Sequence, residues 1–217
     1  MKLFELANNL TNYLKAEGIL FTENGYPIFT EDMLLKEIPE QILPFRQAYA
    51  SKDKSRTLLV SFSKDEDIYP RLFSLDKDIP KYKQFLGVGG FDLSPRINWP
   101  IELQRFNLLL SRLADAYLAI HGIKIMPNFR PGNFETFDVL QTYPTDCCYV
   151  VGSLGCAKGN VEVNKIYLRT KLILTNPHML IYYGKLHEEY IKILNEFLIP
   201  YRRFPDFQSV SRGKEIL

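Results

Sequence analysis

Five short, strongly apolar segments recur along the chain at intervals that a β-strand followed by a crossover helix requires. They are residues 57–62, 85–91, 123–126, 147–151 and 179–183, and their starts are separated by 28, 38, 24 and 32 residues. Because a βαβ unit takes about 30 residues, this spacing predicts parallel strands joined by helices. Segment 147–151 is apolar throughout instead of alternating, which is typical of a strand covered on both faces.

Helical periodicity occupies much of the sequence between and before these segments. Apolar residues recur at helical spacing over 3–17, 101–121 and 186–198, and we also expect helices over 30–37 and 161–174. In 101–121 the apolar stripe leaves one side polar, as in an amphipathic helix. The residues on that polar side are Gln104, Arg105, Ser111, Arg112 and Asp115.

The predicted fold is α/β, with a mostly parallel sheet of about five strands, crossover helices and a helical N-terminal portion. We place the helical portion in residues 1–50, the α/β domain in 57–200 and a basic and aromatic tail in 201–217. Five strands do not complete an eight-stranded barrel, and 217 residues are fewer than the roughly 250 typical of one. The alternatives are therefore an open sheet and a reduced, irregular β/α barrel.

Composition excludes several classes of protein. With 46% hydrophobic and 24% charged residues the chain is neither disordered nor fibrous, and a net charge of +2 argues against bulk electrostatic binding of nucleic acid. Three cysteines, two of them adjacent at Cys147 and Cys148, indicate a reducing compartment. No signal-like N-terminus or membrane-length apolar run is present, so we expect a cytoplasmic protein with no membrane partner.

Polar residues directly follow the predicted strands, where parallel α/β proteins bind their ligands. An aspartate there can act as a base, and an arginine can pair with an anionic group. Capping of the next helix is the competing interpretation, above all for the serines. It is weaker for Asp92, because Gly89 and Gly90 just before it allow close backbone approach. The candidates are Asp92, Asn128, Arg130 and Ser153 for catalysis, and Asp65, Asp67, Ser94 and Gly152 for ligand binding.

Complete catalytic motifs are missing from the sequence. Residues 87–90 lack the dinucleotide-binding spacing of glycines, and 152–155 lack the frame of a serine nucleophile elbow. We predict no structural metal site, because there is no C-x₂-C and no histidine pair at helical spacing. A hard cation held by Asp65, Asp67 and Asp92 is an alternative to a solvated turn, and the cofactor is left open.

The C-terminal segment mixes cations with aromatic residues, which can stack on bases and follow a phosphate backbone. Its candidate nucleic-acid-binding residues are Arg202, Arg203, Arg212 and Lys214. The competing interpretation, which we favour, is that Tyr201, Phe204 and Phe207 pin this segment onto the sheet, because its excess of positive charge is small.

Residues 59–184 carry a series of motifs whose order and spacing resemble a known family. They are Phe-Ser-Lys-Asp-Glu-Asp at 62–67, Phe-Asp-Leu-Ser at 91–94 with Trp-Pro at 99–100, Gly-Ile-Lys-Ile-Met-Pro-Asn at 122–128, Val-Gly-Ser-Leu-Gly at 151–155 and Ile-Tyr-Tyr-Gly at 181–184. The chain resembles an uncharacterised domain family of bacteriophages and mobile elements of low-GC bacteria. That resemblance implies a phage or plasmid source and an accessory role in the host cytoplasm.

Three functional hypotheses follow, and whether the protein is an enzyme stays open among them. The first is an accessory protein that binds a host or element-encoded macromolecule, most readily a protein, for example to counter a host defence or support replication. The alternative is a small α/β enzyme that acts on a phosphorylated or nucleotide substrate through Asp92, Asn128 and Arg130. Nucleic-acid contact through the C-terminal tail is a third hypothesis.

Overall fold

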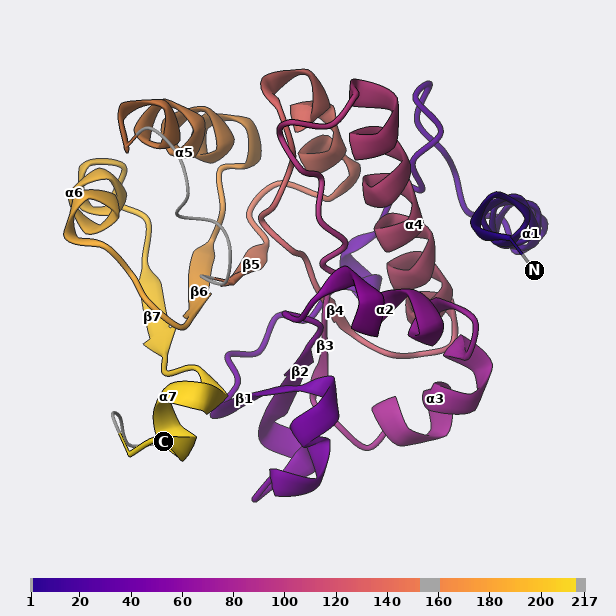
Figure 1. Ribbon diagram of the computed structural model, residues 1–217, viewed down its shortest axis with the longest axis horizontal. Coiled ribbons are helices and arrows are strands. Elements are labelled where there is room, and N and C mark those ends of the chain that lie inside the picture. Colours follow the sequence, from indigo (N-terminus) through magenta and orange to yellow (C-terminus); the bar gives the residue numbers. More distant parts are fainter. Residues whose placement is uncertain (1, 153–160, 214–217) are drawn as a thin grey trace.

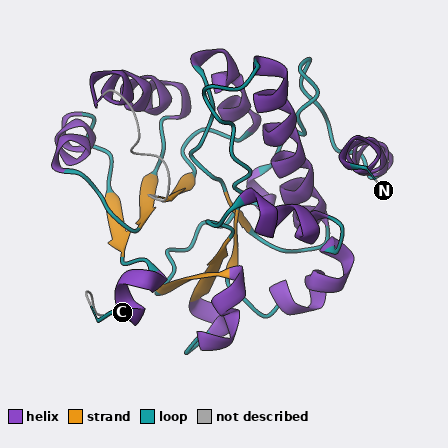
Figure 2. Ribbon diagram, viewed as in Figure 1, coloured by secondary structure: helices purple, strands orange, loops and turns teal. Residues whose placement is uncertain are grey.

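The strands of the computed structural model, which describes residues 2–152 and 161–213, form two parallel sheets flanked by helices (Figures 1 and 2). One sheet contains β1 (Gln41–Pro44), β2 (Thr57–Val60), β3 (Gly87–Gly89) and β4 (Ile125–Met126). The other contains β5 (Cys148–Gly152), β6 (Met179–Tyr183) and β7 (Tyr201–Phe204). Within each sheet every neighbouring pair is parallel, and the spatial order follows the chain.

The two sheets are joined where the chain leaves β4. Asn128 and Val150 form a parallel bridge, in which the Val150 amide donates to the Pro127 carbonyl at 2.8 Å and the Phe129 amide donates to the Val150 carbonyl at 3.0 Å. The strand order is therefore continuous from β1 to β7. Parallel strands in sequential order, with helices in the connections, are the topology of a β/α barrel.

An apolar cluster inside the curved sheets shows that they enclose a barrel. Gly89 of β3 brings no side chain to it, and a Cβ built there would lie 2.9 Å from a Val60 methyl group on β2 and 3.1 Å from a Val150 methyl group on β5. Strands on either side of β3 and β4 thus turn their side chains toward one another. The cluster consists of Leu35, Ile42, Leu58, Val60, Phe62, Met126, Cys148, Val150, Ile181, Tyr183 and Phe204.

The barrel is open between its first and last strands. Ile42 of β1 and Phe204 of β7 share the inner cluster and line one pocket of about 180 Å³, yet no strand pairing joins β1 to β7 in the described residues. The predicted α/β fold is confirmed, and of the two predicted architectures the structure has the reduced, irregular barrel.

All five predicted strands are present, and the structure adds β1 and β7 to them. β1 lies inside the segment predicted to be helical, and β7 lies inside the segment predicted to be a tail, so both segments contribute to the barrel. β1 has only two buried residues, and three residues of β7 are exposed. Their sequences therefore lack the apolar run by which the other strands are recognised.

The helices of the described residues are α1 (Leu3–Ala16), α2 (Asp65–Leu72), α3 (Leu75–Tyr82), α4 (Ile101–Ile120), α5 (Val161–Thr175), α6 (Glu188–Glu196) and α7 (Phe207–Ser211). Four 3₁₀ segments accompany them: η1 (Glu31–Met33), η2 (Phe45–Ala50), η3 (Lys54–Arg56) and η4 (Phe134–Thr142). None of the described helices combines the length and the hydropathy that crossing a bilayer requires.

Four of the five predicted helices are confirmed, and the helix over 30–37 is wrong. That segment has only the turn η1, after which Leu34 bridges to Ile125 and the Leu35 amide donates to the Ile125 carbonyl at 2.8 Å. The two leucines are buried alongside β4 instead of forming one face of a helix.

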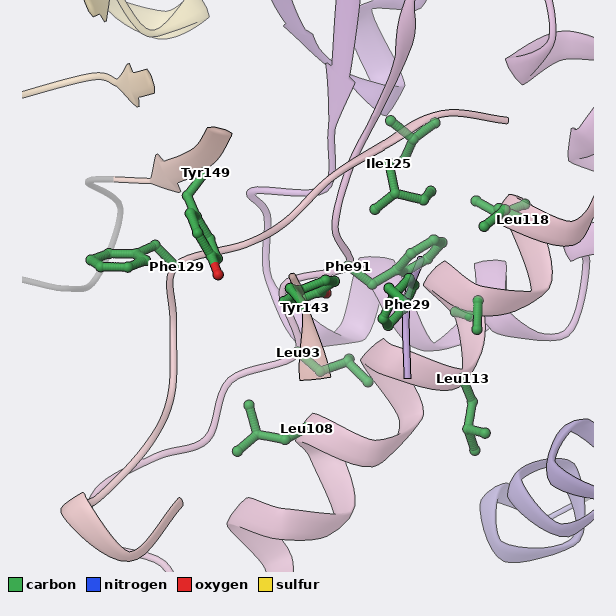
Figure 3. Close-up of a cluster of buried hydrophobic side chains, with 14 of the residues drawn as sticks. Phe29, Phe91, Leu93, Leu108, Leu113, Leu118, Ile125, Phe129, Tyr143 and Tyr149 are labelled. Atoms are coloured by element: carbon green, nitrogen blue, oxygen red, sulfur yellow. The ribbon is translucent and has the colours of Figure 1, made fainter. Parts of the chain in front are cut away.

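Helix α4 is buried on its polar side as well as on its apolar side. α1 covers the outer face of α4, where Phe4 stacks on Phe106 with ring centroids 4.4 Å apart (Figure 1). Leu113 on α4 belongs to a second and larger apolar cluster, the outer core, which also contains Phe91 and Tyr143 (Figure 3). In an ordinary amphipathic helix the polar side faces solvent, whereas the polar side of α4 faces the interior. Its buried residues are Gln104, Asn107, Ser111, Arg112 and Asp115.

Candidate functional site

Three polar side chains from the loops after β3 and β4 form one hydrogen-bonded group at the carboxyl end of the barrel. Asp92 Oδ1 accepts a hydrogen bond from Asn128 Nδ2 at 2.7 Å, and Asp92 Oδ2 accepts one from Arg130 Nη1 at 2.6 Å. We call Asp92, Asn128 and Arg130 the strand-end cluster. The sequence predicted that all three lie at one end of the sheet, and the structure brings them into direct contact.

Backbone geometry explains how the cluster assembles. Gly90 lets β3 run close to the chain after β4, because a Cβ there would lie 3.1 Å from the Asn128 amide nitrogen. Asn128 is itself held by its bridge to β5. The Asp92 amide donates to Ser61 Oγ, at the end of β2, at 2.8 Å. The cluster is thus anchored to four neighbouring strands.

Burial differs sharply between the two charged members of the cluster. The Asp92 side chain is 6% exposed and the Arg130 side chain is 24% exposed. Burial raises the pKa of Asp92, and the Arg130 charge and the Asn128 hydrogen bond oppose that shift without cancelling it. Since both Asp92 oxygens accept hydrogen bonds, the carboxylate orients the Arg130 guanidinium at the surface of the site.

Asp65 and Ser94 lie beside the cluster. Asp65, in the first turn of α2, is buried, and its Oδ1 accepts a hydrogen bond from the Ser94 amide at 2.9 Å. Asp65 Oδ2 lies 3.9 Å from Arg96 Nη2. Among the described residues Asp65 Oδ2 has no hydrogen-bond partner, and the same holds for the buried Asn128 Oδ1. Two buried acceptor atoms are thus left for donors from outside the described chain.

The other predicted ligand-binding residues have different surroundings. Asp67 pairs with Arg46 at the surface, separately from Asp92. Gly152 packs beneath the ring of Phe62, where a Cβ would lie 2.7 Å from the nearest ring atom, and that ring stacks on Tyr183. Gly152 is therefore part of the inner core. Ser153 lies outside the described residues.

Of the predicted nucleic-acid-binding residues that the structure describes, Arg202 and Arg203 point to different faces of β7. Arg202 lies over the Phe204 ring at 4.9 Å, whereas Arg203 Nε donates to the Gly184 carbonyl at 2.7 Å. Adjacent residues of a strand point to opposite faces, so β7 separates these two guanidinium groups. Arg212 follows α7, and Lys214 lies outside the described residues.

Two buried residues beside the cluster were not among the predicted site residues. Ser61 falls within a predicted strand, and Asp115 lies on the polar side of α4. Asp115 Oδ1 accepts a hydrogen bond from the Phe91 amide at 2.8 Å, and burial raises the pKa of Asp115 to about 7. The available signal was the spacing of Asn107, Ser111 and Asp115, which recur every four residues along the helix.

Two surface pockets lie apart from the strand-end cluster. The pocket of about 180 Å³ lies between β1 and β7, and one of about 260 Å³ is lined by Leu34, Leu35, Cys147, Cys148 and His178 among others. Cys147 packs with the outer core and Cys148 with the inner cluster, so the two thiols face opposite sides of β5. In residues 2–152 and 161–213, no three His, Cys, Asp or Glu side chains are grouped to hold a metal ion.

Comparison with known proteins adds one finding. The model of a family described as a domain of unknown function, DUF4417, matches residues 27–201, from the segment before β1 to the first residue of β7. Neither the curated proteins nor the solved structures contain a significant match. The resemblance to an uncharacterised domain family is thereby confirmed, and its link to phages and mobile elements stays a prediction.

Proposed function

The chain belongs to the DUF4417 family, and from its geometry we propose that it binds a phosphorylated or nucleotide small molecule at the carboxyl end of its barrel. The observation that carries the proposal is the strand-end cluster, in which a buried carboxylate holds a partly exposed arginine. In β/α barrels the loops at this end of the strands are the ones that bind ligands.

Arg130 supplies the chemistry for an anionic group. A guanidinium presents its N–H donors in a rigid fork that matches the oxygens of a phosphate, and its charge persists at any physiological pH. The ion pair with Asp92 fixes the orientation of this fork before a ligand arrives. Such preorganisation reduces the entropy that binding costs.

The unpartnered acceptors support a ligand that also carries hydrogen-bond donors. A buried acceptor without a partner costs about 1–3 kcal/mol. Within the described residues Asn128 Oδ1 is in that condition, and Asp65 Oδ2 has no hydrogen bond, only the 3.9 Å ion-pair contact with Arg96. Hydroxyl or amino groups satisfy such atoms, and nucleotides and sugar phosphates combine these groups with phosphate.

Titration calorimetry with AMP, ATP and inorganic phosphate tests the proposal. We expect the wild-type chain to bind at least one of them, and Arg130→Gln to weaken that binding about 10- to 150-fold, the equivalent of the roughly 1.5–3 kcal/mol of a hydrogen bond to a charged group. Arg130→Lys keeps the charge without the fork and falls between the two. Arg169→Gln on α5, which removes an exposed ion pair with Glu196 on α6, is the matched control and leaves binding unchanged.

Equal binding by the wild type and Arg130→Gln would refute the assignment of this site, and no heat with any of the three probes would refute the ligand class. Incubation of each bound nucleotide with the wild-type protein, followed by chromatography of the products, separates an enzyme from a binding protein. Product formation that Arg130→Gln abolishes supports the enzyme hypothesis.

The accessory role, in which the protein binds a host or element-encoded macromolecule, stays a prediction. It depends on the implied phage or mobile-element source. The family match identifies the domain and says nothing about that source. Affinity capture from the producing cell, with wild type and Arg130→Gln side by side, tests it. A stoichiometric protein partner retained by both would favour the accessory role over the strand-end site.

A further inference from the structure

We propose that the buried polar face of α4 positions the strand-end cluster, with Asp115 as the residue that fixes the backbone beside Asp92. We call Asn107, Ser111 and Asp115 the α4 polar row. The inference rests on the proposed function for the ligand, while the contacts on which it depends can be tested without one.

The α4 polar row runs alongside the loop after β3 and contacts three of its residues. Its members are spaced by four, so they lie on one face of the helix. Three contacts join the two segments. Asp115 Oδ1 accepts from the Phe91 amide at 2.8 Å, Ser111 Oγ accepts from the Leu93 amide at 3.4 Å, and Asn107 Nδ2 donates to the Ser94 carbonyl at 2.9 Å.

These contacts flank Asp92 on both sides along the chain. Phe91 precedes it, and Leu93 and Ser94 follow it, while its own amide is held by Ser61. With the backbone held at four consecutive residues, the direction of the Asp92 side chain is set. Because Asp92 orients Arg130, the α4 polar row acts on the ligand site through the backbone, as a positioning element.

Asp115 occupies the most enclosed place in the row. Its Oδ2 lies 3.6 Å from Arg112 Nη1 and accepts from the Tyr143 hydroxyl at 3.5 Å. The loop side is equally close, since a Cβ at Gly90 would lie 2.8 Å from Asp115 Oδ2. Asp115, Arg112, Tyr143 and Gly90 are all buried. A change of the Asp115 side chain therefore acts directly on the backbone of Gly90 and Phe91.

The row is also tied to α2, which carries Asp65. Ser111 Oγ donates to the Asn107 carbonyl at 3.0 Å, and the Tyr69 hydroxyl of α2 donates to Asn107 Oδ1 at 3.0 Å. Asp65 in turn accepts from the Ser94 amide. Helices α2 and α4 therefore hold the same loop from two sides.

Amide hydrogen exchange measured by NMR tests the positioning directly. Asp115→Ala removes the acceptor for Phe91, and we expect exchange of the Phe91 and Leu93 amides to accelerate about tenfold more than exchange of the Leu180 amide in β6, a global reference. Asp115→Asn keeps an oxygen acceptor at the same position and restores protection. Ser111→Ala and its rescue Ser111→Thr repeat the test at Leu93 with a milder change.

Leu118→Ala on the same helix controls for general destabilisation and accelerates all three amides alike. For whichever of AMP, ATP and inorganic phosphate binds the wild type, we expect Asp115→Ala to weaken binding about tenfold, and Asp115→Asn to recover it. The proposal would be overturned if, relative to the Leu180 amide, the exchange rate of the Phe91 amide is unchanged in Asp115→Ala and that of the Leu93 amide is unchanged in Ser111→Ala. It would also be overturned by failure of both conservative variants to rescue. If the wild type binds none of the probes but the exchange pattern holds, the positioning stands and the proposed ligand class fails.

Discussion

The curvature of the sheets around β3 makes a quantitative prediction about two residues far apart in sequence. Gly89 lies on β3 and Val150 on β5, and β4 separates the two strands. A Cβ at Gly89 would lie 3.1 Å from a Val150 methyl group and 2.9 Å from one of Val60, closer than unstrained packing allows. Gly89→Ala should therefore be relieved by Val150→Ala.

The magnitudes follow from general packing energies. Overpacking a core by one methyl group costs about 1–3 kcal/mol, so we expect that loss of stability for Gly89→Ala. Val150→Ala removes two methyl-sized groups and costs about 2 kcal/mol, including the cavity. The double variant should cost at least about 1 kcal/mol less than the sum of the two, because the new methyl group occupies space that Val150 vacates. Relief is partial, since Val60 remains in place.

Urea unfolding of the four proteins, followed by far-UV circular dichroism and by the fluorescence of the single tryptophan, measures this coupling. Gly87→Ala provides the matched control on the same strand. Its Cβ would meet the Lys124 carbonyl at 2.7 Å and Leu35 at 3.1 Å, and Val150 is not among its nearest contacts. Gly87→Ala and Val150→Ala should be additive within about 0.5 kcal/mol. If the effects of Gly89→Ala and Val150→Ala are additive, the side chains of β3 and β5 do not meet inside curved sheets, and an open sheet is favoured.

Three further predictions concern pH, the last strand and the thiols. The folded chain retains the Asp115 proton up to about pH 7, whereas the unfolded chain releases it near pH 3.8. The free energy of unfolding of the wild type, relative to that of Asp115→Asn, should therefore fall as pH rises between these two values, by at most about 4 kcal/mol. Equal pH profiles of the two proteins in urea titrations would contradict this. Ending the chain at Pro200 removes β7 and the buried Phe204 ring. We expect this truncation to lower the free energy of unfolding by at least about 3 kcal/mol and to lower the melting temperature. An unchanged melting temperature would show that residues 201–217 are a dispensable tail. Burial raises the pKa of the Cys147 thiol from 9.0 to about 11. In a Cys148→Ala/Cys156→Ser variant, where Cys147 is the one remaining thiol, it should therefore react with Ellman's reagent about a hundredfold more slowly in the native protein than in urea; equal rates would show that it is accessible.

Much of the fold was predictable from local pattern. The spacing of apolar segments predicted parallel strands with helical crossovers, and the strands found by their apolar runs are all present. Topology alone then placed Asp92, Asn128 and Arg130 at one end of the sheet, because residues that follow parallel strands emerge at the same edge. Their shared location is the part of the candidate site that sequence reasoning anticipated, and their direct contact is what the structure adds.

Strands without a buried apolar run were not predictable in this way. β1 has only two buried residues, and a tyrosine and two arginines open β7. Such a strand is defined by the backbone of the neighbour with which it pairs, and that neighbour is not visible in the local sequence. The predicted helix over 30–37 failed for the same reason, since the packing of Leu34 and Leu35 beside β4 overrides their helical spacing.

Only the tertiary structure decided that the sheets curl into an open barrel and that the α4 polar row faces inward. Periodicity reports which residues share a side of a helix or strand, but it does not report what covers that side. On α4, α1 occupies the outer face, and the interior contains backbone amides that need acceptors. Asp115 is thus a buried residue with a pKa near 7 because of where two distant segments pack, a property that the sequence around it does not contain.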